Sequence, residues 1–227
     1  MPRYAISDIH GCLDTFQELL RQIRFTPADT LYLLGDYIDR GPDSKGVIDY
    51  IWQLQKAGYT LHCLRGNHEE MTLANIQGGS TYPYHDQALL DSFGVSAYRD
   101  IPAEYARWMN DLPYYFETEG YILVHAGLNF RHENPLADTE SMLWIRHCEK
   151  NANLDWLAGR IVVHGHTPTP KIVIEMKVTH LDLLAVLNID AGCVFAQQGA
   201  GFGYLCAFNL DTRELSFVKR NLNPPSS

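Results

Sequence analysis

Five short polar segments carry the residue types that bind metal ions and phosphate groups. They are SDIHG (7–11), GDYIDRG (35–41), RGNHE (65–69), HAG (125–127) and HGHTP (164–168). The candidate ligands are three histidines, two aspartates and an asparagine, with no thiolate: His10, His125, His166, Asp8, Asp36 and Asn67. A mixed nitrogen and oxygen set of this kind suits Mn, Fe or Zn ions better than a structural zinc cage.

Six ligands are enough for two ions, with positions left open for water and substrate. Asp36 directly follows an apolar run and could bridge both ions, while Asp8 and His10 could hold one of them. A two-metal site stabilises the attacking and leaving oxygens of an in-line displacement and lowers the pKa of bound water towards about 7. Arg40 adds planar, bidentate recognition of a phosphate. These residue types predict phosphoester hydrolysis.

Structural interpretations of the same residues stay open. Asp8 and His10 could be a structural pair. They are expected to alternate at a strand end and so to point to the same side. Residues 35–41 could form a salt-bridged turn. Asn67 and His68 could cap a helix that runs from Glu70 onward.

The histidines of the last two segments are interpreted differently from one another. A lone histidine at a strand end is more often structural than a ligand. Because several polar segments occur at matching strand ends, we favour ligand roles for His125 and His166, whereas His164 is interpreted as structural.

Apolar runs precede these segments and must position them. Short apolar runs closed by polar residues are typical of buried strands, which we expect at residues 4–6, 31–34, 61–64, 121–124 and 161–163. Helical patterns follow the first two runs, with one apolar face each: Leu13, Phe16, Leu19, Leu20 and Ile23, then Val47, Ile48, Ile51 and Leu54. Asp8, Asp36 and Asn67 are spaced by about 30 residues, the length of a βαβ unit.

The second half is predicted to complete two sheets. Residues 80–111 have a helical and loop-like pattern, with an exposed turn at 82–84. Further strands are expected at 172–174, 186–189, 204–209 and 214–218, with a hairpin turn at 211–213. The result is a two-sheet α/β domain. Ligands of open α/β sheets bind beyond the carboxyl ends of the strands, which is where the polar segments fall.

The composition is that of an acidic globular protein. Lys and Arg number 18 against 27 Asp and Glu, a net charge of −9. Proteins that neutralise nucleic-acid phosphates show the opposite balance, so we expect no nucleic-acid partner. No run reaches the ~18 apolar residues of a spanning helix, and the first residues do not form a secretory signal. We therefore expect no membrane association and a cytoplasmic location.

The cysteines and the chain length support the same picture. The five cysteines are widely spaced and odd in number, which favours reduced thiols over a disulfide framework. We expect one domain over residues 1–220, a loose tail at 221–227 and a monomer.

The strings SDIHG, GDYIDRG, GNHE, HAG and GHT, in this order, resemble the phosphoprotein phosphatase family of metallophosphoesterases. The similarity runs from about Tyr4 to Cys193 and is greatest to compact bacterial and phage-type serine/threonine phosphatases. One departure is Ser7, where the family usually has glycine. The resemblance implies an α/β fold, a two-sheet β-sandwich flanked by helices (the calcineurin-like metallophosphoesterase fold), with a dinuclear metal site at the strand ends.

The resemblance also implies a role for each site residue. One metal would be held by Asp8, His10 and Asp36, and a second by Asp36, Asn67, His125 and His166. The two divalent ions are expected to be Mn, with Fe or Zn as alternatives. His68 would be the general acid that protonates the leaving oxygen, oriented by Asp39.

The substrate phosphate would be bound by Arg40, by Asn67 and by a second arginine after the HAG motif. Arg146 is the best match for that arginine, and Arg131 is its competitor. Glu69 would support the loop rather than take part in chemistry.

Two substrate classes fit this site. The first is phosphoserine or phosphothreonine in proteins, and the second is a symmetric dinucleoside polyphosphate such as diadenosine tetraphosphate. In the bacterial dinucleoside enzymes the resemblance implies a small residue in place of Asp39, so the presence of Asp39 favours the protein phosphatase. The loops at 78–86 and 129–139 are expected to determine which substrate binds. Activity on phosphotyrosine stays open. A metal-binding module without catalytic activity is disfavoured, because none of the predicted ligands is missing. A nuclease is disfavoured by the net negative charge.

Overall fold

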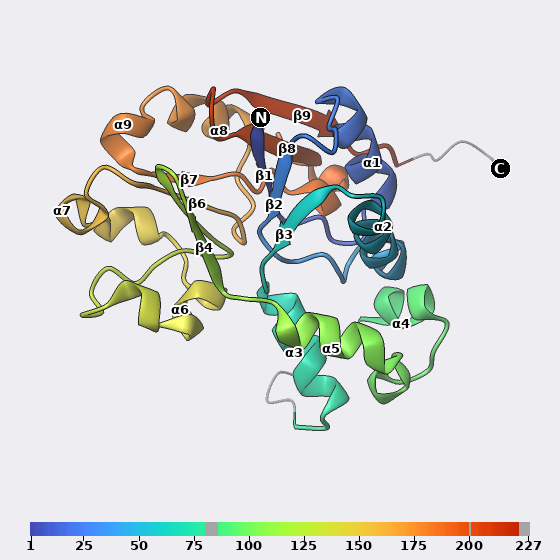
Figure 1. The fold of residues 1–227 in the computed structure, drawn as a ribbon. Helices are drawn as coiled ribbons and strands as arrows, with labels where there is room; N and C mark the ends of the chain where they lie inside the picture. Colours follow the sequence, from blue (N-terminus) through green and yellow to red (C-terminus); the bar gives the residue numbers. More distant parts are fainter. Residues whose placement is uncertain (80–85, 200, 223–227) are drawn as a thin grey trace.

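The computed structural model describes residues 1–79, 86–199 and 201–222, within which two β-sheets pack face to face (Figure 1). Sheet A has the strand order β3-β2-β1-β8-β9, and sheet B the order β4-β5-β6-β7. The strands are β1 (Arg3–Ile6), β2 (Thr30–Leu33), β3 (Thr60–Cys63), β4 (Tyr115–Thr118), β5 (Tyr121–Val124), β6 (Ile161–His164), β7 (Val186–Asn188), β8 (Tyr204–Asn209) and β9 (Leu215–Lys219). The predicted two-sheet α/β sandwich is confirmed.

The central strands of each sheet run parallel. In sheet A these are β1, β2 and β3, and in sheet B they are β5, β6 and β7. Strands β8, β9 and β4 are antiparallel to their neighbours. The carboxyl ends of parallel strands meet at one edge, so the segments that follow these strands leave each sheet together.

The period-2 alternation of strand side chains divides the core into layers. In β2, Leu31 packs with the helices outside sheet A, whereas Tyr32 faces sheet B. In β5, Leu123 belongs to the layer between the sheets and Ile122 to the layer outside sheet B. Because both faces of the central strands are covered, their sequences are apolar runs rather than alternating patterns.

Helices α1, α2, α4 and α5 share the core outside sheet A, and α6 and α7 contribute to the core outside sheet B. The α-helices are α1 (Leu13–Gln22), α2 (Ser44–Lys56), α3 (Asn67–Ile76), α4 (Gln87–Phe93), α5 (Ala103–Asp111), α6 (Thr139–Trp144), α7 (Leu154–Leu157), α8 (Lys171–Val178) and α9 (Leu181–Leu184). Short 3₁₀ helices are η1 (Tyr98–Asp100), η2 (Pro135–Ala137), η3 (Cys148–Asn151) and η4 (Cys193–Gln198). Within the described ranges, no helix is long and apolar enough to span a membrane.

Most predicted elements are confirmed, but the strand predicted at 172–174 is wrong. These residues lie in α8, which begins directly after Pro170, a residue that suits a helix start. Lys171 and Glu175 pair one turn apart at 3.5 Å, and Ile174 alone of α8 is fully buried. Three β-branched or apolar residues in a row were too short a window to reveal this period.

Two further differences concern a boundary and an omission. Helix α3 begins at Asn67 and not at Glu70, so Asn67 and His68 belong to its first turn. Strand β4 was not predicted, because its YFET sequence has only two apolar residues before Glu117. The turn predicted at 82–84 lies outside the described residues.

Candidate metal centre

The predicted ligands follow five different strands and meet where the two sheets adjoin. Asp8 and His10 follow β1, Asp36 follows β2, and Asn67 opens α3 just after β3. His125 and His166 follow β5 and β6 in the other sheet. Backbone hydrogen bonds tie these loops together: His10 N donates to Asp36 O at 2.9 Å, and Gly165 N donates to His125 O at 2.7 Å.

Several of these residues adopt left-handed backbone conformations. The φ angles are 54° at Asp8, 46° at His10, 55° at Asp36 and 70° at His166. Asp8 and His10 therefore do not alternate on a strand, as the sequence suggested, because β1 ends at Ile6. Non-glycine residues with positive φ are uncommon and cluster at functional sites.

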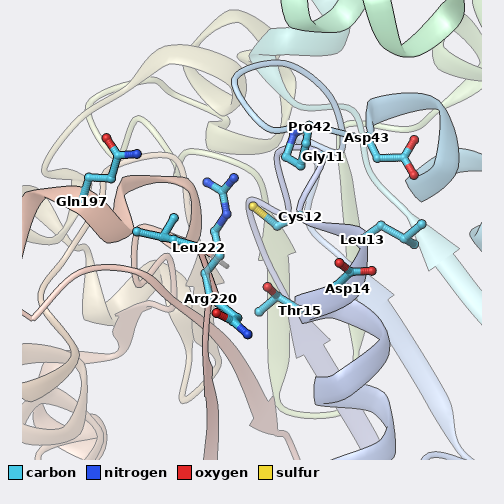
Figure 2. Close-up of a pocket in the computed structure, with 11 residues that line it drawn as sticks. Gly11, Cys12, Leu13, Asp14, Thr15, Pro42, Asp43, Gln197, Arg220 and Leu222 are labelled. Atoms are coloured by element: carbon cyan, nitrogen blue, oxygen red, sulfur yellow. The ribbon is translucent and has the colours of Figure 1, made fainter. Parts of the chain in front are cut away.

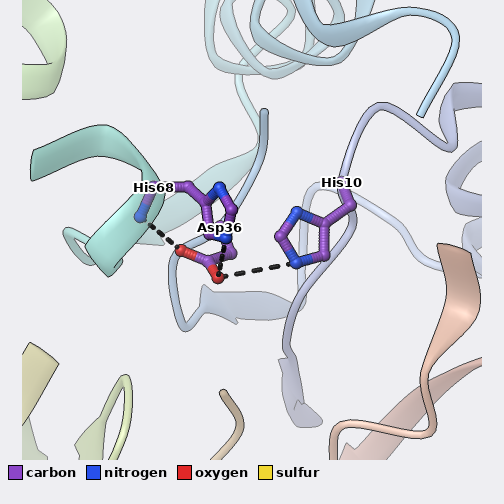
Figure 3. Close-up of side chains that lie close together, drawn as sticks. All are labelled: His10, Asp36 and His68. Atoms are coloured by element: carbon purple, nitrogen blue, oxygen red, sulfur yellow. Dashed lines mark hydrogen bonds and ion pairs between the residues drawn. The ribbon is translucent and has the colours of Figure 1, made fainter. Parts of the chain in front are cut away.

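The candidate ligands form two buried groups that share Asp36. One group is His10, Asp36 and His68 (Figure 3), and the other is Asp36, His125 and His166. Asp36 Oδ2 lies 3.5 Å from His10 Nε2 and 4.0 Å from His68 Nε2, whereas Oδ1 lies 3.5 Å from His125 Nε2. Each carboxylate oxygen thus faces a different group, as a carboxylate that bridges two ions must.

Backbone carbonyls fix which ring nitrogen faces Asp36. His10 Nδ1 donates to Ile38 O at 2.8 Å, and His125 Nδ1 donates to Leu34 O at 2.9 Å. A carbonyl only accepts, so each neutral ring directs the lone pair of Nε2 towards Asp36. This is the arrangement by which outer partners orient metal-binding histidines.

Two acceptor atoms face each other beside the second group. His125 Nε2 and Asn67 Oδ1, both acceptors in this tautomer, lie 2.9 Å apart, and His166 Nδ1 is 2.9 Å from the same oxygen. His166 Nε2 is buried and has no hydrogen-bond partner among the described residues. Converging lone pairs are unfavourable unless a cation lies between them. The residues present therefore fit metal ions of the nitrogen- and oxygen-binding class.

Burial keeps His10 and His166 neutral, which is the form that binds metals. Burial, followed by the charge of Arg40, lowers the pKa of His10 to about 4. Burial, followed by the charge of His125, lowers the pKa of His166 to about 2. Burial and the neighbouring carboxylates of Asp8 and Glu69 raise the pKa of Asp36 well above its usual range. A cation would relieve this repulsion between carboxylates.

Asp8 lies beside the two groups rather than within either of them. Its carboxylate accepts hydrogen bonds from the backbone N–H of His166, at 3.0 Å to Oδ2, and from the Ser7 hydroxyl. Gly165 packs directly against this pair, and a Cβ there would collide with Ser7 Oγ and Asp8 Oδ2. The serine that departs from the family pattern thus contacts a predicted ligand.

His68 and Asp39 form a pair beside the first group. His68 Nδ1 lies 2.5 Å from Asp39 Oδ2, and both side chains are buried. Burial lowers the pKa of His68 and, together with the Asp86 carboxylate, raises the pKa of Asp39. Both directions favour a neutral pair with one proton between the two atoms.

Arg40 contacts the centre directly, whereas Arg146 acts on it through its charge. Arg40 Nη1 lies 2.9 Å from His10 Nε2, and its guanidinium carbon lies 5.5 Å from the centroid of the Phe195 ring. The charge of Arg146, which is exposed, contributes to the lowered pKa of His166. Arg131 instead donates to Asn151 Oδ1 at 3.0 Å. The structure therefore favours Arg146 over Arg131 as the second arginine.

Residues that support this centre were only partly found from the sequence. Glu69, interpreted as a support of the loop, accepts hydrogen bonds from the backbone N–H groups of Asp36, Tyr37 and Gly66 at 2.8–2.9 Å. Asp86 accepts from the backbone N–H of Arg40 at 2.7 Å and was missed, because no local pattern links residues 46 positions apart.

A separate hollow of about 420 Å³ lies at the start of α1 (Figure 2). Its wall includes Cys12, Pro42 and Arg220, and it contains none of the predicted metal ligands. His164 is also apart from the centre: its Nε2 lies 3.7 Å from Cys148 Sγ, in the layer outside sheet B. His164, interpreted from the sequence as structural, lies outside the two groups that share Asp36.

Comparison with known proteins gives one family and one recurring fold. Residues 1–196 match the family model described as calcineurin-like phosphoesterase. A candidate diadenosine tetraphosphatase of known structure is 19% identical, with a TM-score of 0.68 over 98% of this chain and 95% of that one. A protein serine/threonine phosphatase from Saccharomyces cerevisiae is 16% identical, with a TM-score of 0.64 over 99% of this chain and 81% of that one. At these identities the likeness shows the fold alone.

Curated relatives are more similar over a shorter stretch. A protein named symmetrical bis(5'-nucleosyl)-tetraphosphatase from Chromobacterium violaceum is 36% identical over 129 residues, which is 56% of this chain and 44% of that protein. The protein of the same name from Dechloromonas aromatica is 39% identical over 132 residues, again 56% and 44%. The match therefore spans less than half the length of these curated relatives.

Proposed function

The chain belongs to the calcineurin-like phosphoesterase family, and we propose that it hydrolyses symmetrical dinucleoside tetraphosphates with two divalent metal ions. The observation that carries the choice of substrate is the 36–39% identity to two proteins named for that activity. This substrate is the alternative of the sequence analysis, and the relatives favour it over phosphoserine or phosphothreonine in proteins.

Two groups of ligands that meet at Asp36 support a pair of ions. We propose that Asp8, His10 and Asp36 would hold one ion, and that Asp36, Asn67, His125 and His166 would hold the other. When bound, such ions supply Lewis acidity and a nucleophile at neutral pH. The donor set is compatible with Mn, Fe or Zn.

The protein side chains would bind the phosphate and move one proton. Arg40 and Arg146 would bind the oxygens of the phosphoryl group under attack, aided by the Asn67 amide. His68 would donate the proton at Nε2 to the leaving oxygen, because Nδ1 is held by Asp39. In a dinucleoside tetraphosphate the leaving oxygen belongs to a nucleotide phosphate, so it needs less help from an acid than the alkoxide of a phosphothreonine.

Protein phosphatase activity is the second candidate, and the Asp39–His68 pair favours it. The pair places a positioned acid beside the centre, which matters most for poor leaving groups such as serine and threonine alkoxides. The resemblance to the phosphoprotein phosphatases also implies a small residue in place of Asp39 in bacterial dinucleoside enzymes.

The test is a comparison of kcat/KM for diadenosine tetraphosphate and for a phosphothreonine peptide, both in Mn²⁺. Parallel reactions contain EDTA or the variant Asp36→Asn, so that any contaminating phosphatase is measured. A higher kcat/KM for the dinucleotide, with two molecules of ADP as products, supports the proposal. A higher value for the peptide overturns it in favour of the second candidate, and inactivity on both substrates with metals bound overturns both.

A further inference from the structure

A third group of metal-binding side chains lies on the other side of sheet B. It consists of Cys148 and Glu149, from η3, and His164, the last residue of β6. Their sulfur, oxygen and nitrogen atoms all lie within 4.8 Å of one another. Cys148 is 1% exposed and His164 is 3% exposed, and the proposed mechanism uses none of the three.

The spacing of the sulfur and the nitrogen fits one tetrahedral ion. Zinc binds sulfur at about 2.3 Å and nitrogen at about 2.0–2.1 Å, so a tetrahedral angle sets the two ligand atoms about 3.6 Å apart. Cys148 Sγ and His164 Nε2 are separated by 3.7 Å. The pair therefore needs little movement to accept zinc.

The histidine is already oriented for this role. His164 Nδ1 donates to Gly165 O at 3.1 Å, which leaves the lone pair of Nε2 directed at the sulfur.

Glu149 supplies a carboxylate at the outer side of the group. One of its oxygens, Oε1, lies 3.6 Å from Lys177 Nζ and 3.8 Å from His147 Nδ1. Because the Glu149 side chain is 28% exposed, it also gives an ion a path from solvent to the buried sulfur.

We propose that Cys148, His164 and Glu149 form a zinc site distinct from the candidate metal centre. On binding, the Cys148 thiol releases its proton to solvent and the resulting thiolate coordinates the ion. A water molecule or His147 completes the coordination. The set of one sulfur, one imidazole and one carboxylate selects zinc over manganese or magnesium.

The zinc site fixes the chain segment that carries Arg146. This arginine lies two positions before Cys148, between α6 and η3, and its charge acts on His166. Attachment of Cys148 to strand β6 through an ion restricts the backbone that presents the guanidinium to the phosphate.

Cobalt(II) distinguishes this site from the candidate metal centre, because only this site has a thiolate. The full chain is freed of metals and titrated with Co²⁺ alone while the near-ultraviolet spectrum is recorded. We expect a thiolate-to-cobalt charge-transfer band in the wild type and in Cys206→Ser, a control that removes a buried cysteine of β8. Zn²⁺ added afterwards removes the band.

Two variants assign the band. Cys148→Ser abolishes it, and Glu149→Gln, at a partly exposed position, weakens cobalt and zinc affinity by at least the 10–100-fold typical of lost outer partners. Absence of the band in the wild type, or its persistence in Cys148→Ser, overturns the proposal. If Cys148→Ser does not fold, as judged by circular dichroism, Glu149→Gln decides: unchanged affinity then overturns the proposal.

Discussion

His68 Nδ1 lies 2.5 Å from Asp39 Oδ2 in a pair whose histidine is 1% exposed and whose aspartate is fully buried. Asp39 Oδ1 has no hydrogen-bond partner among the described residues, so the carboxylate binds the imidazole through Oδ2. His68 Nε2 points towards Asp36, at 4.0 Å from Oδ2. This geometry leaves two roles for Nε2, proton donor or metal ligand, and a substitution separates them.

We predict that His68→Asn retains both metal ions and lowers kcat by roughly 10²–10⁴-fold on the phosphothreonine peptide. The loss is smaller on diadenosine tetraphosphate, because its leaving oxygen needs less protonation. Metal content by atomic emission and kcat on both substrates check this prediction. Loss of one ion would show that His68 is a ligand rather than the acid.

Asp36→Asn is predicted to lose affinity for both ions, since each oxygen of Asp36 faces a different ligand group. Titration of the metal-free variant with Mn²⁺ measures this loss. Asp211→Asn, which removes a partner of Arg3 at the surface, is the matched control and should bind metals like the wild type. Two ions bound to Asp36→Asn at unchanged affinity would exclude a bridging role.

Glu69→Gln is predicted to lower the free energy of unfolding by about 1–3 kcal/mol. One side-chain oxygen becomes an N–H₂ group that faces backbone donors, so buried N–H groups among Asp36, Tyr37 and Gly66 lose their acceptor. Urea denaturation of the metal-free protein measures the change. Glu70→Gln is the control, because it weakens only the ion pair between Arg65 and the partly exposed Glu70 carboxylate. It should lower the free energy of unfolding by less than about 1 kcal/mol.

Gly165→Ala is predicted to weaken metal binding and to destabilise the fold by about 1–3 kcal/mol. The added methyl group collides with Ser7 Oγ and Asp8 Oδ2, and therefore displaces a predicted ligand. Gly79→Ala, where a Cβ meets open space, is the control. Calorimetric titration with Mn²⁺ and thermal unfolding give the two readouts; wild-type metal affinity in Gly165→Ala would mean that Asp8 is not needed.

His62 makes part of the stability depend on pH. Burial lowers its pKa below the unfolded value of 6.5, so the folded state favours the neutral ring. Its contribution is present above pH 6.5 and is lost as the pH falls from there towards the folded pKa. His62→Phe keeps the ring contacts with Tyr32 and Phe116 but cannot titrate, so its unfolding free energy should fall less on acidification. Parallel pH profiles of the two proteins would contradict this assignment.

The candidate metal ligands were accessible from the sequence because each lies within four residues of the end of an apolar strand. The chain fixes the distance from β1 to Asp8 and from β2 to Asp36, and parallel strands end at a common edge. Their backbone conformation was not accessible: positive φ at Asp8 and His10 depends on the hydrogen bonds of the neighbouring loop, such as His10 N to Asp36 O. The extended alternation assumed for them was wrong for that reason.

Contacts between distant segments were also out of reach. Asp86 binds the backbone of Arg40, and Phe195 packs on its guanidinium, although both are far from it in sequence. The helix α8 was taken for a strand because three apolar residues have no measurable period, and its docking through Ile174 is a tertiary contact. The proposed substrate differs from the one that the sequence favoured, because the proposal rests on similarity to relatives and not on a local motif.

The sequence by itself determined the candidate ligand types, the order of strands that present them and the broader calcineurin-like phosphoesterase family, because these are properties of residue identity and spacing along the chain. Only the tertiary structure decided how the ligands group around Asp36, which nitrogen of each histidine faces it and that Cys148, Glu149 and His164 form a separate group. These features depend on the packing of two sheets against each other and on carbonyl acceptors such as Leu34 O, 91 positions from His125. Such contacts leave no periodic signal, because they join residues that only the completed fold brings together.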